Sequence, residues 1–204
     1  MTDPHAVTTP EQLAAAYKAP SELVLNKVAD RIDPRTAAFI AGSPFCVLAT
    51  FGARGPHCTP RGDAPGFIDV LDERTLALPD RRGNNRLDAL RDVLDNPAVA
   101  LLFLVPGVGE TLRIGGQARL TTDPGLRERY TVQDQAPATV MLVEVREVYM
   151  QCARAILRSR IWKQDSRATA VPTGGELLEV HTKGLIAADY YDKERAPEIG
   201  RVLY

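Results

Sequence analysis

The sequence predicts a mainly β protein in which antiparallel strands form a barrel with helices at its ends. Seven short runs of β-type residues follow one another between residues 45 and 148. Turn sequences such as 52–56 and 106–107 separate the runs, and connections this short join antiparallel neighbours. About seven such strands in one domain close most economically into a barrel. The chain has 204 residues, of which 45% are hydrophobic, so one domain with a proper core is expected.

The elements are expected in the following order. Apolar residues at helical spacing predict a helix over 21–32, and Asp33-Pro34 begins a second helix that ends at Gly42. Strands are predicted at 45–51, 57–61, 67–71, 75–79, 99–105, 111–120 and 138–148. One helix interrupts the strands, because an apolar stripe begins at Leu87 and the sequence 95–97 ends it. Segments 152–162 and 175–191 are also helix-like.

One domain is expected to contain all of these elements. Residues 1–42 form an N-terminal helical segment that packs on the barrel, and residues 43–150 form the barrel. Residues 151–204 form a C-terminal helical segment, which is too short and too little apolar to be a second domain.

Charge and composition exclude several classes of protein. The 25 basic and 26 acidic side chains give a formal net charge of −1, so no nucleic-acid partner is expected. The longest apolar run, 99–105, is too short to span a bilayer, and the N-terminus lacks a signal pattern. Three separate cysteines and three scattered histidines form no disulfide framework and no metal motif. These features predict a cytoplasmic protein without membrane association.

The most informative segment is 79–86, with the sequence PDRRGNNR, which leaves a strand and enters the interrupting helix. Free backbone N–H groups at a helix start, the positive end of the helix dipole and three arginines form a site suited to a phosphate. The alternative is that Asn84 or Asn85 only caps the helix and the arginines are solvated.

Two further polar clusters interrupt strand-like sequence. The cluster 59–63 (TPRGD) places a charged pair and a glycine where a structural strand would alternate apolar residues. It suggests either a close approach to a planar ligand or a bulge with a surface ion pair. The cluster 110–116 (ETLRIGG) opens a strand whose polar face carries Thr111 and Arg113.

Taken together, these segments resemble the pyridoxamine-phosphate-oxidase-like FMN-binding family. The resemblance runs from about residue 21 to residue 162. It rests on the motifs SPF at 43–45, TPRGD at 59–63, PDRRGNNR at 79–86, ETLR at 110–113 and the segment 152–162. Each motif alone is weak, and their occurrence in register carries the resemblance.

The resemblance implies an antiparallel split β-barrel that binds FMN without a covalent bond, between the two subunits of a homodimer. In the family, one strand beginning with arginine lies along the flavin, and a Ser-Arg-Lys triplet holds its phosphate. Asn84, Asn85 and Arg86 stand where that triplet would be, and Arg81 or Arg82 could compensate for the lost charge. The residues implied to bind the cofactor are Arg61, Gly62, Asp63, Pro79, Asp80, Arg82, Asn84, Asn85, Arg86, Thr111, Arg113, Arg154, Arg158 and Trp162.

The family resemblance implies an FMN-dependent oxidoreductase that acts on an unknown small substrate. No general acid or base is assigned. Arg154, Arg158 and Trp162 are spaced by four, so they are expected along one helical face, where they either cover the flavin ring or contact a second subunit. The sequence after Trp162 lacks the segment with which pyridoxine-phosphate oxidases cover their substrate, so vitamin B6 oxidation is not expected. The alternatives are a non-catalytic flavin-binding or flavin-buffering protein and haem binding on the same fold.

Overall fold

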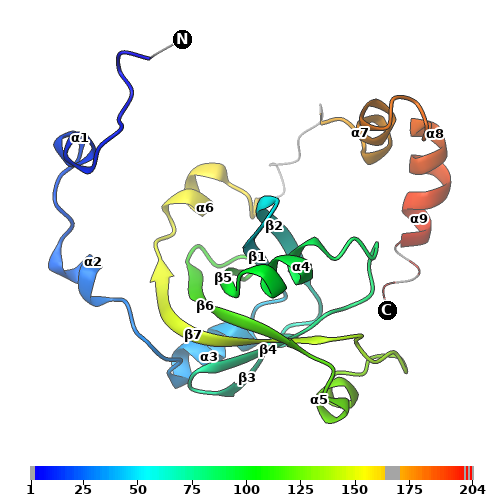
Figure 1. The fold of residues 1–204 in the computed structure, drawn as a ribbon, viewed down its shortest axis with the longest axis horizontal. Helices are drawn as coiled ribbons and strands as arrows, with labels where there is room; N and C mark the ends of the chain where they lie inside the picture. Colours follow the sequence, from blue (N-terminus) through cyan, green and yellow to red (C-terminus); the bar gives the residue numbers. More distant parts are fainter. Residues whose placement is uncertain (1–2, 164–170, 200, 202, 204) are drawn as a thin grey trace.

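A computed structural model of the chain describes residues 3–163, 171–199, 201 and 203. In this part of the chain, seven strands form one antiparallel sheet in the order β2-β1-β5-β6-β7-β4-β3 (Figure 1). The strands are β1 (Phe45–Gly52), β2 (Gly55–Gly62), β3 (Asp69–Asp72), β4 (Thr75–Pro79), β5 (Ala98–Leu104), β6 (Thr111–Thr121) and β7 (Val140–Gln151). The prediction of seven antiparallel strands is confirmed.

The sheet curls into a barrel that its backbone hydrogen bonds do not close. Strands β2 and β3 are the two edges of the sheet, and no ladder joins them. The fold is therefore a split β-barrel, as the family resemblance implies. We call the gap between β2 and the β3–β4 pair the seam.

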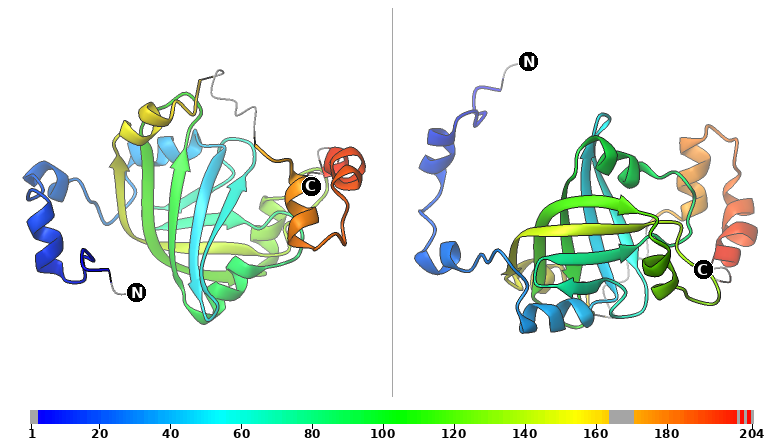
Figure 2. Two further views of the ribbon diagram at one scale, coloured as in Figure 1. Left: turned by 90° about the horizontal axis from the view of Figure 1, so that it is seen from above. Right: turned by 60° about the horizontal axis from the view of Figure 1, so that its bottom comes forward.

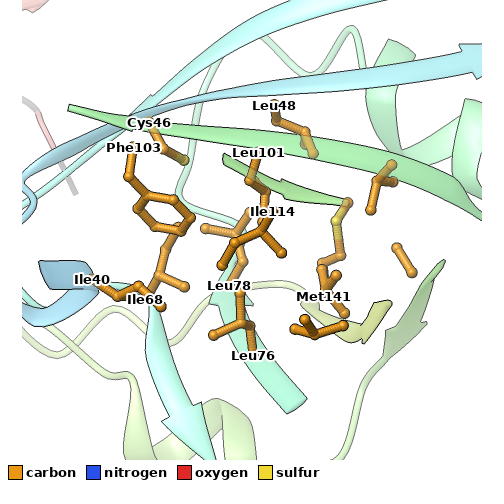
Figure 3. Packing of buried hydrophobic residues seen from close by; sticks show 14 of the residues in the cluster. Ile40, Cys46, Leu48, Ile68, Leu76, Leu78, Leu101, Phe103, Ile114 and Met141 are labelled. Atoms are coloured by element: carbon orange, nitrogen blue, oxygen red, sulfur yellow. The ribbon is translucent and has the colours of Figure 1, made fainter. Parts of the chain in front are cut away.

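The inside of the barrel holds the main hydrophobic core. Alternate residues of each strand face inward, so β1 contributes Cys46 and Leu48, and β5 contributes Leu101 and Phe103 (Figure 3). Burial raises the pKa of the Cys46 thiol to about 12, so this cysteine acts as a small apolar residue.

The longest strands, β6 and β7, contain an irregularity that only glycine can occupy. Their register shifts between Gly115 and Gly116. A Cβ atom on Gly116 would lie 2.2 Å from the carbonyl oxygen of Glu144 on β7. Bulges of this kind bend a strand and increase its twist, which suits the curvature of a barrel.

Strand β2 tolerates two prolines because it is an edge strand. Pro56 and Pro60 have no N–H group to donate, and β2 pairs with β1 alone. Prolines on an edge also hinder pairing with a strand of another molecule.

Helices surround the barrel (Figure 1). They are α1 (Pro10–Ala16), α2 (Glu22–Asn26), α3 (Pro34–Ala41), α4 (Asp88–Asp95), α5 (Pro124–Arg129), α6 (Arg154–Ser159), α7 (Gly174–His181), α8 (Ala188–Tyr190), a π-helical turn (Tyr191–Arg195) and α9 (Ala196–Ile199). Helix α3 adds Ile40 to the core, whereas every residue of α1 is exposed. Helices α1 and α2 lie on one side of the barrel, and α7 to α9 lie on the other (Figure 2). None of the described helices is long and apolar enough to cross a bilayer.

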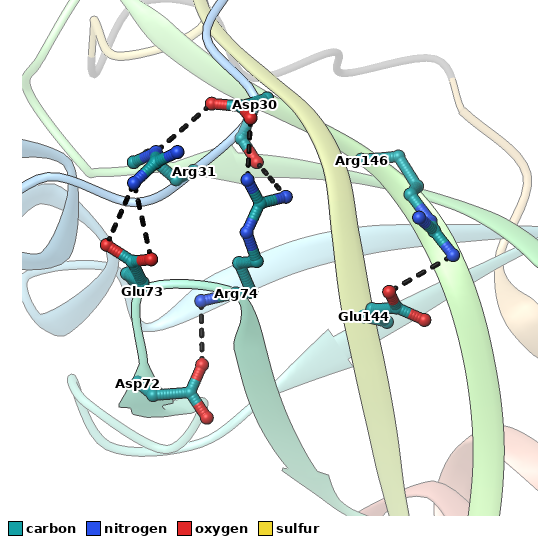
Figure 4. Close-up of polar contacts among 7 residues, drawn as sticks. All are labelled: Asp30, Arg31, Asp72, Glu73, Arg74, Glu144 and Arg146. Atoms are coloured by element: carbon teal, nitrogen blue, oxygen red, sulfur yellow. Dashed lines mark hydrogen bonds and ion pairs between the residues drawn. The ribbon is translucent and has the colours of Figure 1, made fainter.

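The first predicted helix is shorter than the sequence pattern suggests. It ends at Asn26, and Ala29 then pairs with Val148 of β7. Ion pairs fix the following residues to the β3–β4 turn, because Arg74 binds Asp30 at 2.6 Å and Arg31 binds Glu73 at 3.3 Å (Figure 4). Backbone pairing with the barrel therefore replaces the second half of the predicted helix.

Candidate functional site

A cavity of about 630 Å³ lies at the seam, in the size range of small-molecule sites. One wall is the end of β2, with Thr59 and Arg61. The segment 80–87, which we call the anion loop, runs from β4 to α4 (Figure 1). It forms a second wall of the cavity. The start of α4 (Asp88, Ala89 and Leu90), Arg127 of α5 and residues of the connection from α5 to β7 complete the lining.

Two crossed ion pairs join the edges of the seam. Arg61 of β2 donates to Asp80 at 2.9 Å, while Arg81 donates to Asp63 at 2.7 Å. In each pair one residue comes from the end of β2 and the other follows β4, so the two pairs replace the missing ladder. The four side chains are largely buried, with exposed fractions that range from 5% for Asp63 to 23% for Arg61. Ion pairs at this depth are screened less than exposed ones.

Arg61 also presents a donor that the protein leaves unused. Its Nε atom is buried and meets no hydrogen-bond acceptor among the described residues. The only other such side-chain atom among the described residues is Thr139 Oγ1. Buried donors usually have partners, so these two atoms are exceptions, and the Arg61 side chain would have to move for its Nε atom to reach a ligand in the cavity.

The anion loop differs from the predicted helix start. Helix α4 begins at Asp88, with Leu87 as its N-cap, so Asn84, Asn85 and Arg86 all precede the helix. The side chain of Asn84 accepts the backbone N–H of Arg86 at 3.0 Å and therefore caps the loop itself. Asn85 and Leu87 have left-handed backbones, with φ of 56° and 60°. The loop is a strained turn, because a bulky residue such as leucine rarely adopts this conformation.

The arginines of the anion loop differ in their partners. Arg81 donates to Asp63 and, at 2.5 Å, to the carbonyl oxygen of Tyr130, so it holds the loop against the connection from α5. Arg86 is 71% exposed and pairs with Asp88. Arg82 is exposed, and none of the described residues forms an ion pair with it.

Asp88 joins Arg86 to the β1–β2 hairpin. Its carboxylate accepts from Arg54 and from Arg86, and these two hydrogen bonds, that from Arg54 first, lower its pKa to about 2. Asp88 is therefore a carboxylate at any physiological pH.

Five arginines line the cavity, against two carboxylates, Asp80 and Asp88. The excess positive charge favours an anionic ligand. Arg127 was not predicted from sequence, because its pattern in a short polar helix is that of a solvated residue. Its Nε atom donates to Pro137 O at 2.8 Å, which leaves the rest of the guanidinium beside the cavity.

The structure brings together part of the predicted site. Arg61, Asp80, Arg82, Asn84, Asn85 and Arg86 all line the cavity. Asp63 is held at its edge through Arg81, and Gly62 and Pro79 end the two strands at the seam.

The remaining predicted residues lie elsewhere in the same chain. Thr111 is buried at the start of β6, and Arg113 lies on the outer face, 3.6 Å from Glu147. Arg154 and Arg158 are exposed on α6. Trp162 is not on their helix, because α6 ends at Ser159. Its indole N–H instead donates to Val108 O at 2.7 Å.

The comparison with protein families agrees with this architecture. Residues 32–152, more than half of the chain, match the family described as pyridoxamine 5'-phosphate oxidase. The chain belongs to this family. No curated protein matches the sequence.

Solved structures similar to this family member include HupZ of Group A Streptococcus, with 18% identity, a TM-score of 0.47 and coverage of 57% of this chain and 91% of that chain. A second is a Clostridium acetobutylicum protein related to general stress protein 26, of the pyridoxinephosphate oxidase family. Its identity is 12%, its TM-score 0.45, and the coverage is 58% of this chain and 86% of that chain.

Proposed function

We propose that this protein binds FMN non-covalently in the seam cavity and acts as an FMN-dependent oxidoreductase on a small substrate. The observation that carries the proposal is the cavity itself, which is rich in arginine and lies at the open side of a barrel of this family. The exposed side chain of Arg82, which lines the cavity, suits a ligand that carries a phosphate.

In this proposal the anion loop binds the phosphate. Arg82 and Arg86 supply charge, and Asn84 fixes the turn that presents their backbone. The end of β2 lies along the ring, where Arg61 is oriented by Asp80. FMN would supply the transfer of electrons or hydride, and the protein would control access to the ring and the charge beside it.

We further propose that the active form is a two-fold homodimer. The outer face of the sheet supports this, because it carries apolar side chains where a free surface would be polar. Val47 and Ala49 of β1 lie opposite Leu102 and Ala100 of β5, and all four are only half-buried. Phe51, at the end of the same row, is 55% exposed. A second copy of the chain would cover this face.

The homodimer also accounts for the predicted residues that lie far from the cavity. Thr111, Arg113, Arg154, Arg158 and Trp162 line no part of the cavity of their own chain. In the proposal they reach the flavin bound by the partner. Sedimentation of the flavin-bound protein at micromolar concentration as a monomer would contradict this part.

Purified protein tests the cofactor directly. We expect about one FMN per subunit and tighter binding of FMN than of riboflavin, since the anion loop contributes only to the former. Equal affinity for the two flavins would contradict the role of the loop. Reduction of the bound flavin by a nicotinamide or deazaflavin donor, followed by reoxidation with a panel of acceptors, separates an enzyme from a flavin-buffering protein.

Haem is less well supported as the ligand of this cavity. The described lining contains no histidine, cysteine, methionine or tyrosine that could bind haem iron. Absorbance spectra after adding haem or FMN to the purified protein distinguish the two ligands.

A further inference from the structure

Helix α4 carries a row of three carboxylates that faces the β1–β2 hairpin. Asp88, Asp92 and Asp95 are spaced by four and three residues, which places them on one side of a helix. All three contact the hairpin. Asp88 pairs with Arg54, and Asp95 accepts the backbone N–H of Ala53 at 3.4 Å.

The central carboxylate of the row is buried. The side chain of Asp92 is 3% exposed, and its Oδ2 atom accepts the Thr50 hydroxyl at 2.7 Å. The same oxygen lies 2.6 Å from Nδ1 of His57 on β2. The hydrogen bond from Thr50, which is the larger effect, and the contact with His57 lower the pKa of Asp92 against the opposing effect of burial. A buried carboxylate needs such partners, so each one removed leaves it less well satisfied.

The fit between hairpin and helix is also close at the backbone. A Cβ atom on Gly52 would lie 2.9 Å from the Cα atom of Asp92 and 2.3 Å from its Oδ1 atom. The helix therefore contacts the hairpin without an intervening side chain, and Asp92 is fixed by shape as well as by hydrogen bonds.

The anion loop ends where this contact begins. Leu87, in its left-handed conformation, is the N-cap of α4, and Asn85 shares that conformation. Non-glycine residues persist in such conformations only when the surrounding structure fixes them. Among the described residues, the side-chain bonds at this end of the loop join Asn84 to Arg86 and Arg86 to Asp88, so they fix the loop to itself and to α4. The position of α4 is thus the main constraint at this end of the loop.

We propose that Asp92, together with Thr50 and His57, is a positioning group that holds the anion loop in its phosphate-binding shape. None of the three residues lines the cavity, so they act through α4 and not by contact with the ligand. The inference rests on the proposed function, in that the loop binds the phosphate of FMN.

Matched pairs of variants test the proposal in the full chain. His57→Leu and Thr50→Val remove the donors to Asp92, whereas His57→Asn and Thr50→Ser keep a donor near the same place. The measurements are the Kd for FMN, the Kd for riboflavin and, without flavin, hydrogen exchange of the Arg86 and Arg91 amides, whose acceptors are Asn84 Oδ1 and Leu87 O of the loop. Asp95→Asn, at the exposed end of the row, is the control.

We expect His57→Leu and Thr50→Val to weaken FMN binding by roughly tenfold, with riboflavin binding changed by less than about twofold. Exchange of the Arg86 and Arg91 amides rises in both variants, while His57→Asn, Thr50→Ser and the control resemble the wild type. Thr50→Val changes the shape of its side chain least, so it provides the measurement if His57→Leu fails to fold.

Two results would overturn the proposal. One is wild-type FMN affinity and wild-type exchange in both donor-removing variants. The other is an equal loss of FMN and riboflavin affinity, which would mean that Asp92, Thr50 and His57 stabilise the fold in general and not the shape of the loop. If the wild type binds no FMN, the proposed function fails, and exchange decides the positioning role. Faster exchange of the Arg86 and Arg91 amides then supports that role, and unchanged exchange contradicts it.

Discussion

Replacement of Arg86 by alanine tests whether the anion loop binds a phosphate. A hydrogen bond between a guanidinium and a phosphate contributes about 1.5–3 kcal/mol, which corresponds to roughly tenfold to a hundredfold in affinity. Arg86 already pairs with Asp88. When FMN binds, the Arg86 guanidinium must either leave Asp88 for the phosphate or bind both groups. We therefore expect the lower end of the range, about a tenfold weaker Kd for FMN.

The same substitution should leave other properties unchanged. Arg86 is 71% exposed, and Asp88 keeps Arg54 as a partner, so the melting temperature of the flavin-free protein should stay near that of the wild type. Riboflavin lacks the phosphate, so its Kd should hardly change. Arg91→Ala is the matched control, because Arg91 is an exposed arginine of α4 outside the cavity.

Calorimetric titration of wild type and both variants with the two flavins gives all the required constants. Equal weakening of FMN and riboflavin by Arg86→Ala would indicate a disturbed fold. An unchanged FMN constant would show that Arg86 is a solvated residue and that the phosphate binds elsewhere.

Three further predictions concern stability and the distant residues. Gly116→Ala should destabilise the protein by about 2 kcal/mol or more, because its Cβ would collide with a β7 carbonyl, while Gly83→Ala meets no atom and should melt like the wild type. The lowered pKa of Asp92 gives stability that is present above the ordinary aspartate pKa and is lost as pH falls through the folded-state value. The free energy of unfolding of Asp92→Asn should thus differ from that of the wild type most at neutral pH and approach it in acid. Trp162 is the only tryptophan, so FMN titration should quench the intrinsic emission, and undiminished emission would remove Trp162 from the site.

The barrel was predictable because strands leave a local signal. Alternating apolar residues and short turns determine both the positions of the strands and their antiparallel pairing. The first helix was overextended for a reason that is not local, since pairing of Ala29 with Val148, more than a hundred residues away, ends it. The order of the strands, and with it the seam, also depends on long-range pairing.

The site was only partly predictable. The arginines of segment 79–86 are visible in the sequence, and residues 80–86 line the cavity in the structure. The left-handed Leu87 was not foreseeable, because leucine gives no local signal for that conformation. His57 looked isolated among scattered histidines, and only the packing of α4 on the hairpin brings it to Asp92. The spacing of Asp88, Asp92 and Asp95 beside an apolar stripe was the available signal.

Side chains alone join the two edges of the seam, so the strand pairing of the barrel does not depend on what fills the cavity. If the cavity binds FMN as proposed, the flavin would enter and leave through local rearrangement of arginine and aspartate side chains, with the backbone ladders kept intact. Occupancy of the cavity would then follow the supply of FMN.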